Sequence, residues 1–459
     1  MDPKSAKRWT PGPATPRLLP DPQRRRRILG LALPILGGML SQNVMNLVDT
    51  GMVGVLGDGA LAAVGLSSFA GFMAMAFLMG MSVGVQAMAA RRLGAERHSD
   101  TAVPLNGGLA LVLLIALPSS MLLIWLVPEL YPLLASDAEV VQLGVPYLQV
   151  RLIAMAGVGM NFAFRGYWNA VNLSRLYMRT LLLMHACNIF LNWLLIFGNL
   201  GFPRLGVTGA GIATAVATYL GTLHYFVLAL RYARPGGFLR GLPDRFTMLA
   251  LLRLSVPAGV QQFLFAAGIT TLFWILGQLG TRELAAANVI MNLTLVGILP
   301  MLGFGLAAAS LVGQALGRSD RADATQWGWD VSRLAMVVVA ALELPVALFP
   351  ELFLRVFIHD PETLQLASLP LRLVALTLWF DAMGTVLLNA HLGAGHSRRA
   401  MAISVAMQWG AFLPLAYVLG PVLGHGLQEI WLMNIAYRTL QAVIFAWSWR
   451  QGRWAESRV

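Results

Sequence analysis

Apolar residues run through this chain in long stretches, separated by short segments rich in glycine, proline and charge. Each stretch has roughly the 20 residues that an α-helix, rising about 1.5 Å per residue, needs to cross a bilayer. Prolines near the ends of several stretches fit this, because neighbouring helices can satisfy the carbonyls that proline frees. We predict twelve spans, with soft edges, at residues 29–54, 61–89, 103–127, 142–168, 179–199, 208–231, 249–278, 284–315, 329–349, 364–392, 400–420 and 426–448.

Composition narrows the class of protein. Hydrophobic residues make up 57% of the 459 residues and charged residues 12%; soluble proteins have roughly 45–50% and 25%. So few charges cannot cover a soluble protein of this length, which excludes a soluble enzyme, a DNA-binding protein and a disordered scaffold. The single cysteine, Cys187, excludes an internal disulfide and a cysteine-ligated cluster. We therefore predict an all-α polytopic membrane protein.

The distribution of arginine predicts the topology. The net charge of +12 could indicate nucleic-acid binding, but positive residues also collect in the cytoplasmic loops of membrane proteins. If both termini are cytoplasmic, every inner loop is basic, and the outer loops hold only Arg204, Arg282 and Arg355 beside several acids. We expect both termini in the cytoplasm, contact with membrane lipid, and no nucleic acid.

The polar segments outside the spans are predicted to be tails and loops. Arg24–Arg27 precede the first apolar run, as in a twin-arginine export signal, but that run continues past Asp49 without a cleavage site, too long for a signal. We predict a disordered cytoplasmic tail at 1–28, a cytoplasmic loop at 232–248 and a second cytoplasmic tail at 449–459.

The two halves of the chain repeat each other at one constant offset of 223 residues. Pro34 falls on Pro257, Gly80 on Gly303, and further matches join 54 to 277, 61–63 to 284–286, 93–94 to 316–317 and 174–175 to 397–398. Six spans per half relate the repeats by an axis along the membrane normal. The pattern predicts two six-helix lobes, 29–231 and 249–448, a cleft between them, and a transporter that works by alternating access.

Four segments carry motifs of a known family. Residues 46–54 read NLVDTGMVG, 187–193 read CNIFLNW, 206–215 read GVTGAGIATA, and 380–382 read FDA. With the span plan, these segments resemble the MATE (multidrug and toxic compound extrusion) transporters of NorM and DinF type. The resemblance implies an antiporter of a bacterial inner membrane that exports drugs or toxic metabolites, often cationic and amphipathic, against protons or sodium.

Asp49 is the first candidate for coupling that export to a cation. A carboxylate within a span costs about 2.5–3.5 kcal/mol on insertion scales and is a functional hypothesis by default. Asn188 and Asn192 share one helix face at a spacing of four, and their amides can bind a carboxylate or a cation. The resemblance implies that these positions surround Asp49, with Thr214 as a fourth member. Helix–helix hydrogen bonding is the alternative role for the amides.

A second group of candidates involves Asp381, the acid within the tenth span, as a substrate or cation site. Gln261 and Gln262 offer uncharged polar groups near this second-half site, and Gln42 is a further candidate for binding substrate or cation. NorM-like relatives place a glutamate where this chain has Phe265, so their sodium site is incomplete here.

Several alternatives stay open. A lipid-linked oligosaccharide flippase of the same superfamily would need a basic cavity for its pyrophosphate, and acids outnumber evident cavity bases in the spans. Glu343, Arg151 and Arg372 are interpreted as structural. An intramembrane enzyme would need a nucleophile–base or metal cluster, which the sequence lacks. We expect no enzymatic activity, no cofactor, no metal other than a possible Na⁺ at Asp49 or Asp381, and a monomer.

Overall fold

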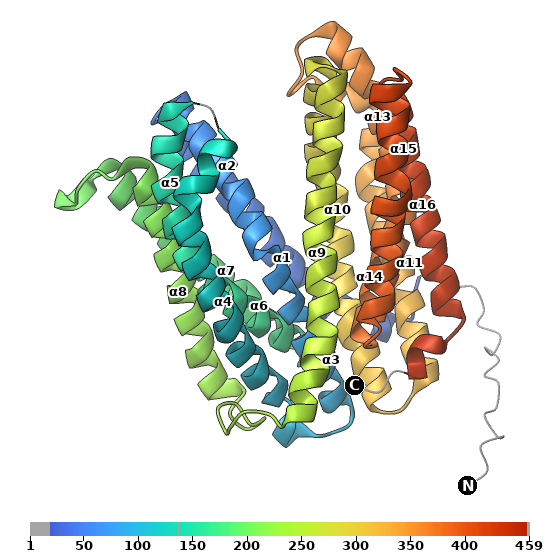
Figure 1. Cartoon of the computed structure of the whole chain (residues 1–459). Helices are drawn as coiled ribbons and strands as arrows, with labels where there is room; N and C mark the ends of the chain where they lie inside the picture. Colours follow the sequence, from blue (N-terminus) through green and yellow to red (C-terminus); the bar gives the residue numbers. More distant parts are fainter. Residues whose placement is uncertain (1–18, 136, 457–459) are drawn as a thin grey trace.

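The computed structural model describes residues 19–135 and 137–456, which form helices joined by turns and short loops (Figure 1). The first lobe contains α1 (Pro22–Gly54), α2 (Asp58–Ala76), α3 (Gly80–Gly94), α4 (Val103–Leu130), α5 (Ala138–Ile153), α6 (Met155–Ala170), α7 (Ser174–Phe197) and α8 (Gly206–Tyr232). The second lobe contains α9 (Arg245–Leu279), α10 (Thr281–Gly317), α11 (Arg321–Leu348), α12 (Pro350–Leu354), α13 (Pro361–Gly393), α14 (Ser397–Val405), α15 (Leu413–Tyr417) and α16 (Leu427–Arg450).

Each of the twelve predicted spans corresponds to helix. Ten helical stretches among the described residues are long and apolar enough to cross a membrane, and the pair α5 and α6, bent by 46° around Ala154, makes an eleventh. The twelfth is α16, a helix of 24 residues. It is long enough to cross, but Glu429, Asn434 and Arg438 make it more polar than the others. The fold is an all-α polytopic membrane protein.

The two predicted tails are shorter than expected. Helix α1 begins at Pro22, where Asp21 caps it by accepting from the backbone amide of Gln23 at 3.0 Å, so Arg24–Arg27 lie in the helix. At the other end, Trp454 stacks on Trp449 with ring centroids 3.8 Å apart, which holds the turn after α16 against the protein. These segments are ordered because their side chains find partners on neighbouring helices. Residues 1–18 and 457–459 of the predicted tails lie outside the described residues.

Each lobe buries the first turns of the other lobe's first helix in its hydrophobic core, at positions that correspond in the repeat. Ile28 and Leu31, at the start of α1, are buried in the core of the second lobe. Their repeat mates Leu251 and Leu254, at the start of α9, are buried in the core of the first lobe. The first helix of each half therefore begins in the opposite lobe. This reciprocal burial joins the lobes at the end where α1 and α9 begin.

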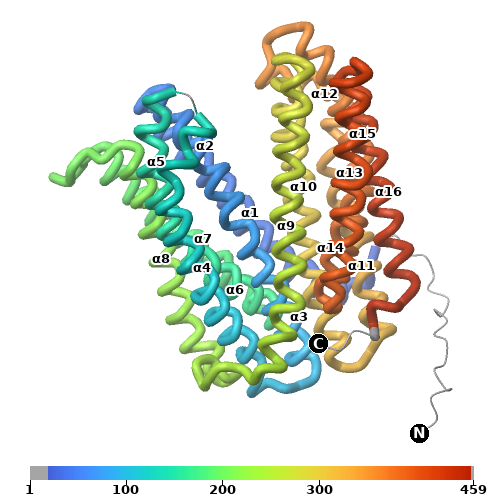
Figure 2. Tube along the Cα trace, in the orientation of Figure 1, coloured from blue at the N-terminus to red at the C-terminus, as the bar shows by residue number. Residues whose placement is uncertain are grey.

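The lobes meet at that end and diverge towards the other, where α2 and α5 are separated from α10 and α12 (Figures 1 and 2). Hydrogen bonds cross between the lobes at the joined end: Gln86 donates to the carbonyl of Leu306 at 2.8 Å and to the hydroxyl of Ser310 at 2.8 Å. Gln314 donates to the carbonyl of Ala170 at 2.8 Å and accepts from Arg27 at 2.7 Å. This end is closed by specific polar contacts as well as by the exchanged apolar residues.

Candidate functional site

A cavity of about 540 Å³ lies in the first lobe, a volume within the range of small-molecule sites. Helices α1, α2, α5, α6, α7 and α8 line it, with Leu299 of α10 from the second lobe. Its wall combines polar groups with flexible and aromatic apolar ones, which suits ligands of varied shape. The apolar part consists mainly of Met39, Met45, Met75, Met79, Met184, Phe72, Phe162, Tyr177 and Tyr225.

Asp49 lies in this cavity beside the three residues predicted to surround it: Asn188 and Thr214 also line the cavity, and Asn192 is fully buried next to it. The amide nitrogen of Asn192 donates to Oδ1 of Asp49 at 2.5 Å. Turned so that its oxygen accepts from the Thr214 hydroxyl at 3.2 Å, the amide of Asn188 donates to the same Oδ1 at 2.9 Å. The two asparagines reach one carboxylate because residues four apart on α7 share a helix face. Asp49, Asn188, Asn192 and Thr214 therefore lie together, as predicted. Their role in coupling transport to a cation stays a prediction.

One hydrogen-bond acceptor in the cluster around Asp49 has no donor among the described residues. Oδ1 of Asn192 is buried and makes no hydrogen bond within the described part of the chain. An amide can rotate to present either its N–H donors or its oxygen. The asparagines can therefore donate to an ionised Asp49 and accept from a protonated one, which is what a carboxyl that changes its protonation state needs.

Gln42, a candidate for binding substrate or cation, lines this cavity and not the one that contains Asp381. Its Oε1 lies 3.3 Å from Nε2 of His185, and its amide donates to Asn46 at 3.2 Å. Nδ1 of His185 is buried without a hydrogen-bond partner among the described residues. Together these groups continue the polar strip from Asp49 along α1, since residues 42, 46 and 49 are spaced as one face of a helix.

Two arginines also line the first-lobe cavity, which corrects the expectation that acids outnumber bases there. Arg151 was interpreted as structural, and Arg165 did not stand out in the sequence; both face the cavity from α5 and α6. Arg151 donates to the hydroxyl of Tyr147 at 3.5 Å and attracts Asp49 through space. Arg165 donates to the Ser82 hydroxyl at 3.2 Å. Their place within predicted spans, away from the basic loops, was the signal that could have identified them.

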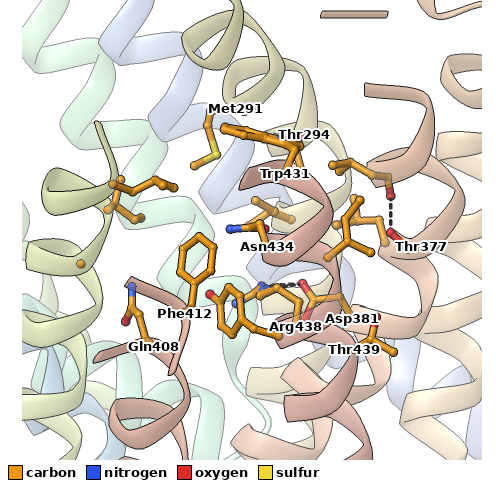
Figure 3. Close-up of a pocket in the computed structure, with 18 of the residues that line it drawn as sticks. Met291, Thr294, Thr377, Asp381, Gln408, Phe412, Trp431, Asn434, Arg438 and Thr439 are labelled. Atoms are coloured by element: carbon orange, nitrogen blue, oxygen red, sulfur yellow. Dashed lines mark hydrogen bonds and ion pairs between the residues drawn. The ribbon is translucent and has the colours of Figure 1, made fainter. Parts of the chain in front are cut away.

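The second lobe has a smaller cavity, of about 100 Å³, between α9, α10, α13 and α16 (Figure 3). Asp381 lies in it, but Arg438 of α16 binds this carboxylate through Nε at 3.1 Å and also through Nη2. Both contacts end on Oδ2 of Asp381. A cation at Asp381 would have to compete with this guanidinium, so the second lobe does not offer the free carboxylate that the sequence suggested. Arg438 had not been recognised in the sequence.

The other residues predicted for the second lobe do not join Asp381. Gln261 donates instead to the hydroxyl of Ser404 on α14 at 3.3 Å. Neither Gln261 nor Gln262 lines the cavity. Glu343 is 2% exposed, and its Oε1 has no hydrogen-bond partner in residues 19–135 and 137–456. Among the same residues, no cluster of three or more histidine, cysteine, aspartate or glutamate side chains could hold a metal ion.

The fold and the cavities define the class: a duplicated, two-lobed polytopic membrane protein with one polar cavity in each lobe. The chain belongs to the MatE family, whose profile matches residues 34–194 and 257–418. The two matched segments begin 223 residues apart, at Pro34 and Pro257, as the repeat predicts. The family expected from the motifs is therefore confirmed.

Relatives match along almost the whole chain. The probable multidrug resistance protein NorM of Thermotoga maritima is 28% identical, over 95% of this chain and 95% of that protein. The protein of the same name from Pseudomonas aeruginosa is 27% identical over 88% and 85%.

Solved structures agree on the fold. A MOP superfamily transporter from Pyrococcus furiosus, described with a binding pocket of reversed polarity, is 23% identical with a TM-score of 0.85, covering 96% of this chain and 98% of its own. An outward-facing multidrug resistance MATE family transporter is 22% identical with a TM-score of 0.85, covering 95% and 97%.

Proposed function

We propose that this protein is a secondary active multidrug exporter of a bacterial inner membrane that exchanges its substrates for protons bound at Asp49. The observation that carries the proposal is the contact of Asn192 with Asp49 at 2.5 Å in a large cavity of the first lobe. The names of the NorM relatives support drug export, and the family supports a transporter without cofactor or enzymatic activity. In this proposal the protein is a monomer, since residues of a single chain line both cavities.

The arrangement of the lobes supports alternating access. They are joined at the end where α1 begins and α16 ends, and they diverge at the other end (Figure 1). With cytoplasmic termini, as the arginine distribution predicts, the end at which the lobes diverge faces away from the cytoplasm. The described conformation is then the one that releases substrate outside and receives the coupling cation.

Protons suit Asp49 better than sodium does. A bare metal cation requires several oxygen ligands, whereas the groups turned towards Asp49 are largely N–H donors of Asn192 and Asn188. A proton on Asp49 removes the negative charge that these donors stabilise and changes the hydrogen bonds between α1 and α7. A coupling ion can shift a conformational equilibrium only by the difference between its affinities for the two states. We assign that difference to these hydrogen bonds and to a repacking of α1.

Transport of a fluorescent cationic dye, rhodamine 6G, into inside-out vesicles tests the proposal. Wild-type protein is compared with Asp49→Asn under an imposed proton gradient and, separately, a sodium gradient. The double variant Asp381→Asn with Arg438→Gln is the matched control, because it removes the acid of the second-lobe cavity together with its partner. We expect proton-driven uptake that disappears in Asp49→Asn and persists in the double variant. Undiminished proton-driven uptake in Asp49→Asn contradicts the proposal, and sodium-driven uptake reassigns the cation.

A second candidate function has gained support from one observation. A flippase of lipid-linked oligosaccharides needs cationic groups for a pyrophosphate, and Arg151 and Arg165 both line the first-lobe cavity. Against it stands the acidic group of Asp49 in the wall of this cavity, whose lining belongs to the first lobe except for Leu299. Translocation of a fluorescent undecaprenyl pyrophosphate analogue by reconstituted protein, without dye export, would favour the flippase.

A further inference from the structure

We propose that Arg165 is a binding site for an acidic group, so that the preferred substrates are aromatic amphipathic compounds carrying a carboxylate, sulfonate or phosphate besides any cationic group. The inference rests on the proposed function for its view of the cavity as a substrate site, and it adds the substrate class. It also reverses the expectation, drawn from the family resemblance, that the cavity selects for positive charge.

The charges that line the cavity are out of balance. Asp49 is the acidic residue in the wall, and Arg151 and Arg165 face the same space. Arg151 attracts Asp49 electrostatically. Arg165 lies fourteen positions beyond Arg151 along the bent α5–α6 pair, at most about 20 Å from it at a rise of about 1.5 Å per residue. Arg151 therefore offsets the charge of Asp49, whereas Arg165 has polar partners but no acidic one among the residues that line the cavity.

Two other arginines in the protein interior have counter-ions. Arg438 is paired with Asp381 in the second-lobe cavity. Arg24 is paired with Asp323 at 2.6 Å and with Asp330 at 2.5 Å. Arg165 forms no ion pair with any residue in the described part of the chain. A cation at membrane depth without a partner is costly and is a functional hypothesis by default, so this exception points to a missing anionic ligand.

Arg165 is held in place for such a ligand. Its Nε donates to the Ser82 hydroxyl at 3.2 Å, and its guanidinium lies 4.7 Å from the ring centroid of Phe162. A guanidinium has five N–H donors in a planar fork, the geometry that binds a carboxylate or phosphate through two parallel bonds. Ser82 and the Tyr177 hydroxyl each accept a hydrogen bond from the guanidinium, which leaves its remaining N–H donors for a ligand on the cavity side.

Aromatic groups beside Arg165 suit the apolar body of the substrate. Phe162, Tyr177 and Tyr225 line the same part of the cavity, and both tyrosines interact electrostatically with Arg165. Met79 adds an unbranched, polarizable side chain to the wall. An aromatic acid can therefore place its ring system against these side chains while its anionic group meets the guanidinium.

Two dyes that differ only at one acidic group provide the test. Rhodamine 110 has a free carboxylate, and rhodamine 123 is its methyl ester and a cation. Fluorescence polarisation of each dye gives the Kd of the purified full-length protein in nanodiscs of neutral lipid. We compare wild type with Arg165→Gln, with Arg165→Lys, and with Arg372→Gln, an arginine exposed on α13.

We expect wild type and Arg372→Gln to bind rhodamine 110 more tightly than rhodamine 123. Arg165→Gln should weaken rhodamine 110 by about tenfold to a hundredfold, the value of a charge-assisted hydrogen bond, and leave rhodamine 123 within about twofold. Arg165→Lys should restore part of the loss and shows that the site still folds. Equal affinities of wild type for the two dyes, or equal losses of both in Arg165→Gln, overturn the proposal.

Two further outcomes separate this proposal from others. The first uses nanodiscs that contain phosphatidylglycerol. If this lipid displaces rhodamine 110 from wild type but not from Arg165→Gln, the acidic ligand is a lipid, and the assignment to drugs is overturned. The second concerns the proposed function. Because the Kd is measured without any ion gradient, it does not depend on coupling at Asp49. Failure of the proton-exchange experiment together with discrimination between the dyes would refute the proposed function and leave the acidic-group site standing.

Discussion

Gly94 of the first lobe and Gly317 of the second, 223 residues apart, pack directly against each other at the closed end. A Cβ atom at Gly317 would lie 2.9 Å from Cα of Gly94 and 2.1 Å from the carbonyl oxygen of Arg91. A Cβ atom at Gly94 would lie 2.0 Å from the carbonyl oxygen of Gln314, which is the repeat mate of Arg91. The backbones of the two lobes approach this closely only because neither position has a side chain.

Replacing Gly317 by alanine should open this contact. The added methyl group meets backbone and not a flexible side chain, so α3 and α10 must move apart, at a cost of about 1–3 kcal/mol. We expect a lower Tm in detergent and slower dye export. Gly30→Ala is the control, because nothing lies within 4 Å of a Cβ there. An unchanged Tm and export rate in Gly317→Ala would show that the lobes do not depend on this approach.

The hydrogen bond of Asn192 to Asp49 predicts a specific transport defect. Asn192→Ala removes the donor at 2.5 Å, so the charged form of Asp49 loses stabilisation that distinguishes it from the protonated form. We expect proton-driven export to fall roughly tenfold, as for the loss of a hydrogen bond to a charged group. Asn292→Ala is the control, because Asn288 and Asn292 form an exposed pair at the same spacing, without a carboxylate. Equal export by both variants would argue against the role of Asn192.

The ion pair between Arg438 and Asp381 should contribute to stability more than to coupling. Arg438→Gln leaves a carboxylate without its partner in the membrane interior, at a cost of about 3–5 kcal/mol. The double variant with Asp381→Asn should recover much of the lost Tm. Arg282 and Glu362 form an exposed pair, for which Arg282→Gln should cost less than about 1 kcal/mol. A double variant no more stable than Arg438→Gln would contradict a direct pairing.

Arg24 should stabilise the closed end. It joins α1 to α11 through Asp323 and Asp330, and its guanidinium stacks 3.6 Å from the ring centroid of Trp327. Arg24→Gln removes these contacts and leaves Asp330, whose side chain is 4% exposed, without its main counter-ion. We expect a lower Tm and easier opening of this end, seen as faster hydrogen exchange at the start of α1. Arg26→Gln, at an exposed position of the same helix, should change neither.

Much of the fold was predictable because a bilayer imposes a simple rule on sequence. Every predicted span corresponds to helix, since a chain in hydrocarbon must satisfy its backbone hydrogen bonds internally. The repeat offset of 223 predicted two lobes, and the reciprocal burial of Ile28 and Leu251 follows that offset. The start of α1 was missed because Arg24–Arg27 look like a solvated tail until their partners on α10 and α11 are known.

The first-lobe cluster was predictable in part for a local reason. Asn188 and Asn192 share a helix face at a spacing of four, and Asp49 is a rare intramembrane acid, so a contact between them could be anticipated from the family motifs. Arg438 was overlooked because its partner, Asp381, lies 57 residues away on another helix. Gln261 and Gln262 were predicted as uncharged polar groups near Phe265, but they precede the part of α9 that lines the cavity, and Gln261 donates to Ser404.

The sequence by itself determined the number and approximate positions of the spans, the duplication and several of the polar residues at membrane depth. These properties follow from hydrophobicity, helix geometry and the cost of charge in lipid, all of which act locally along the chain. Only the tertiary structure decided which interior charges are balanced. Asp381 is neutralised by Arg438, whereas Arg165 faces a cavity without a counter-ion, because electrostatic pairing depends on distance in space and not on separation along the chain.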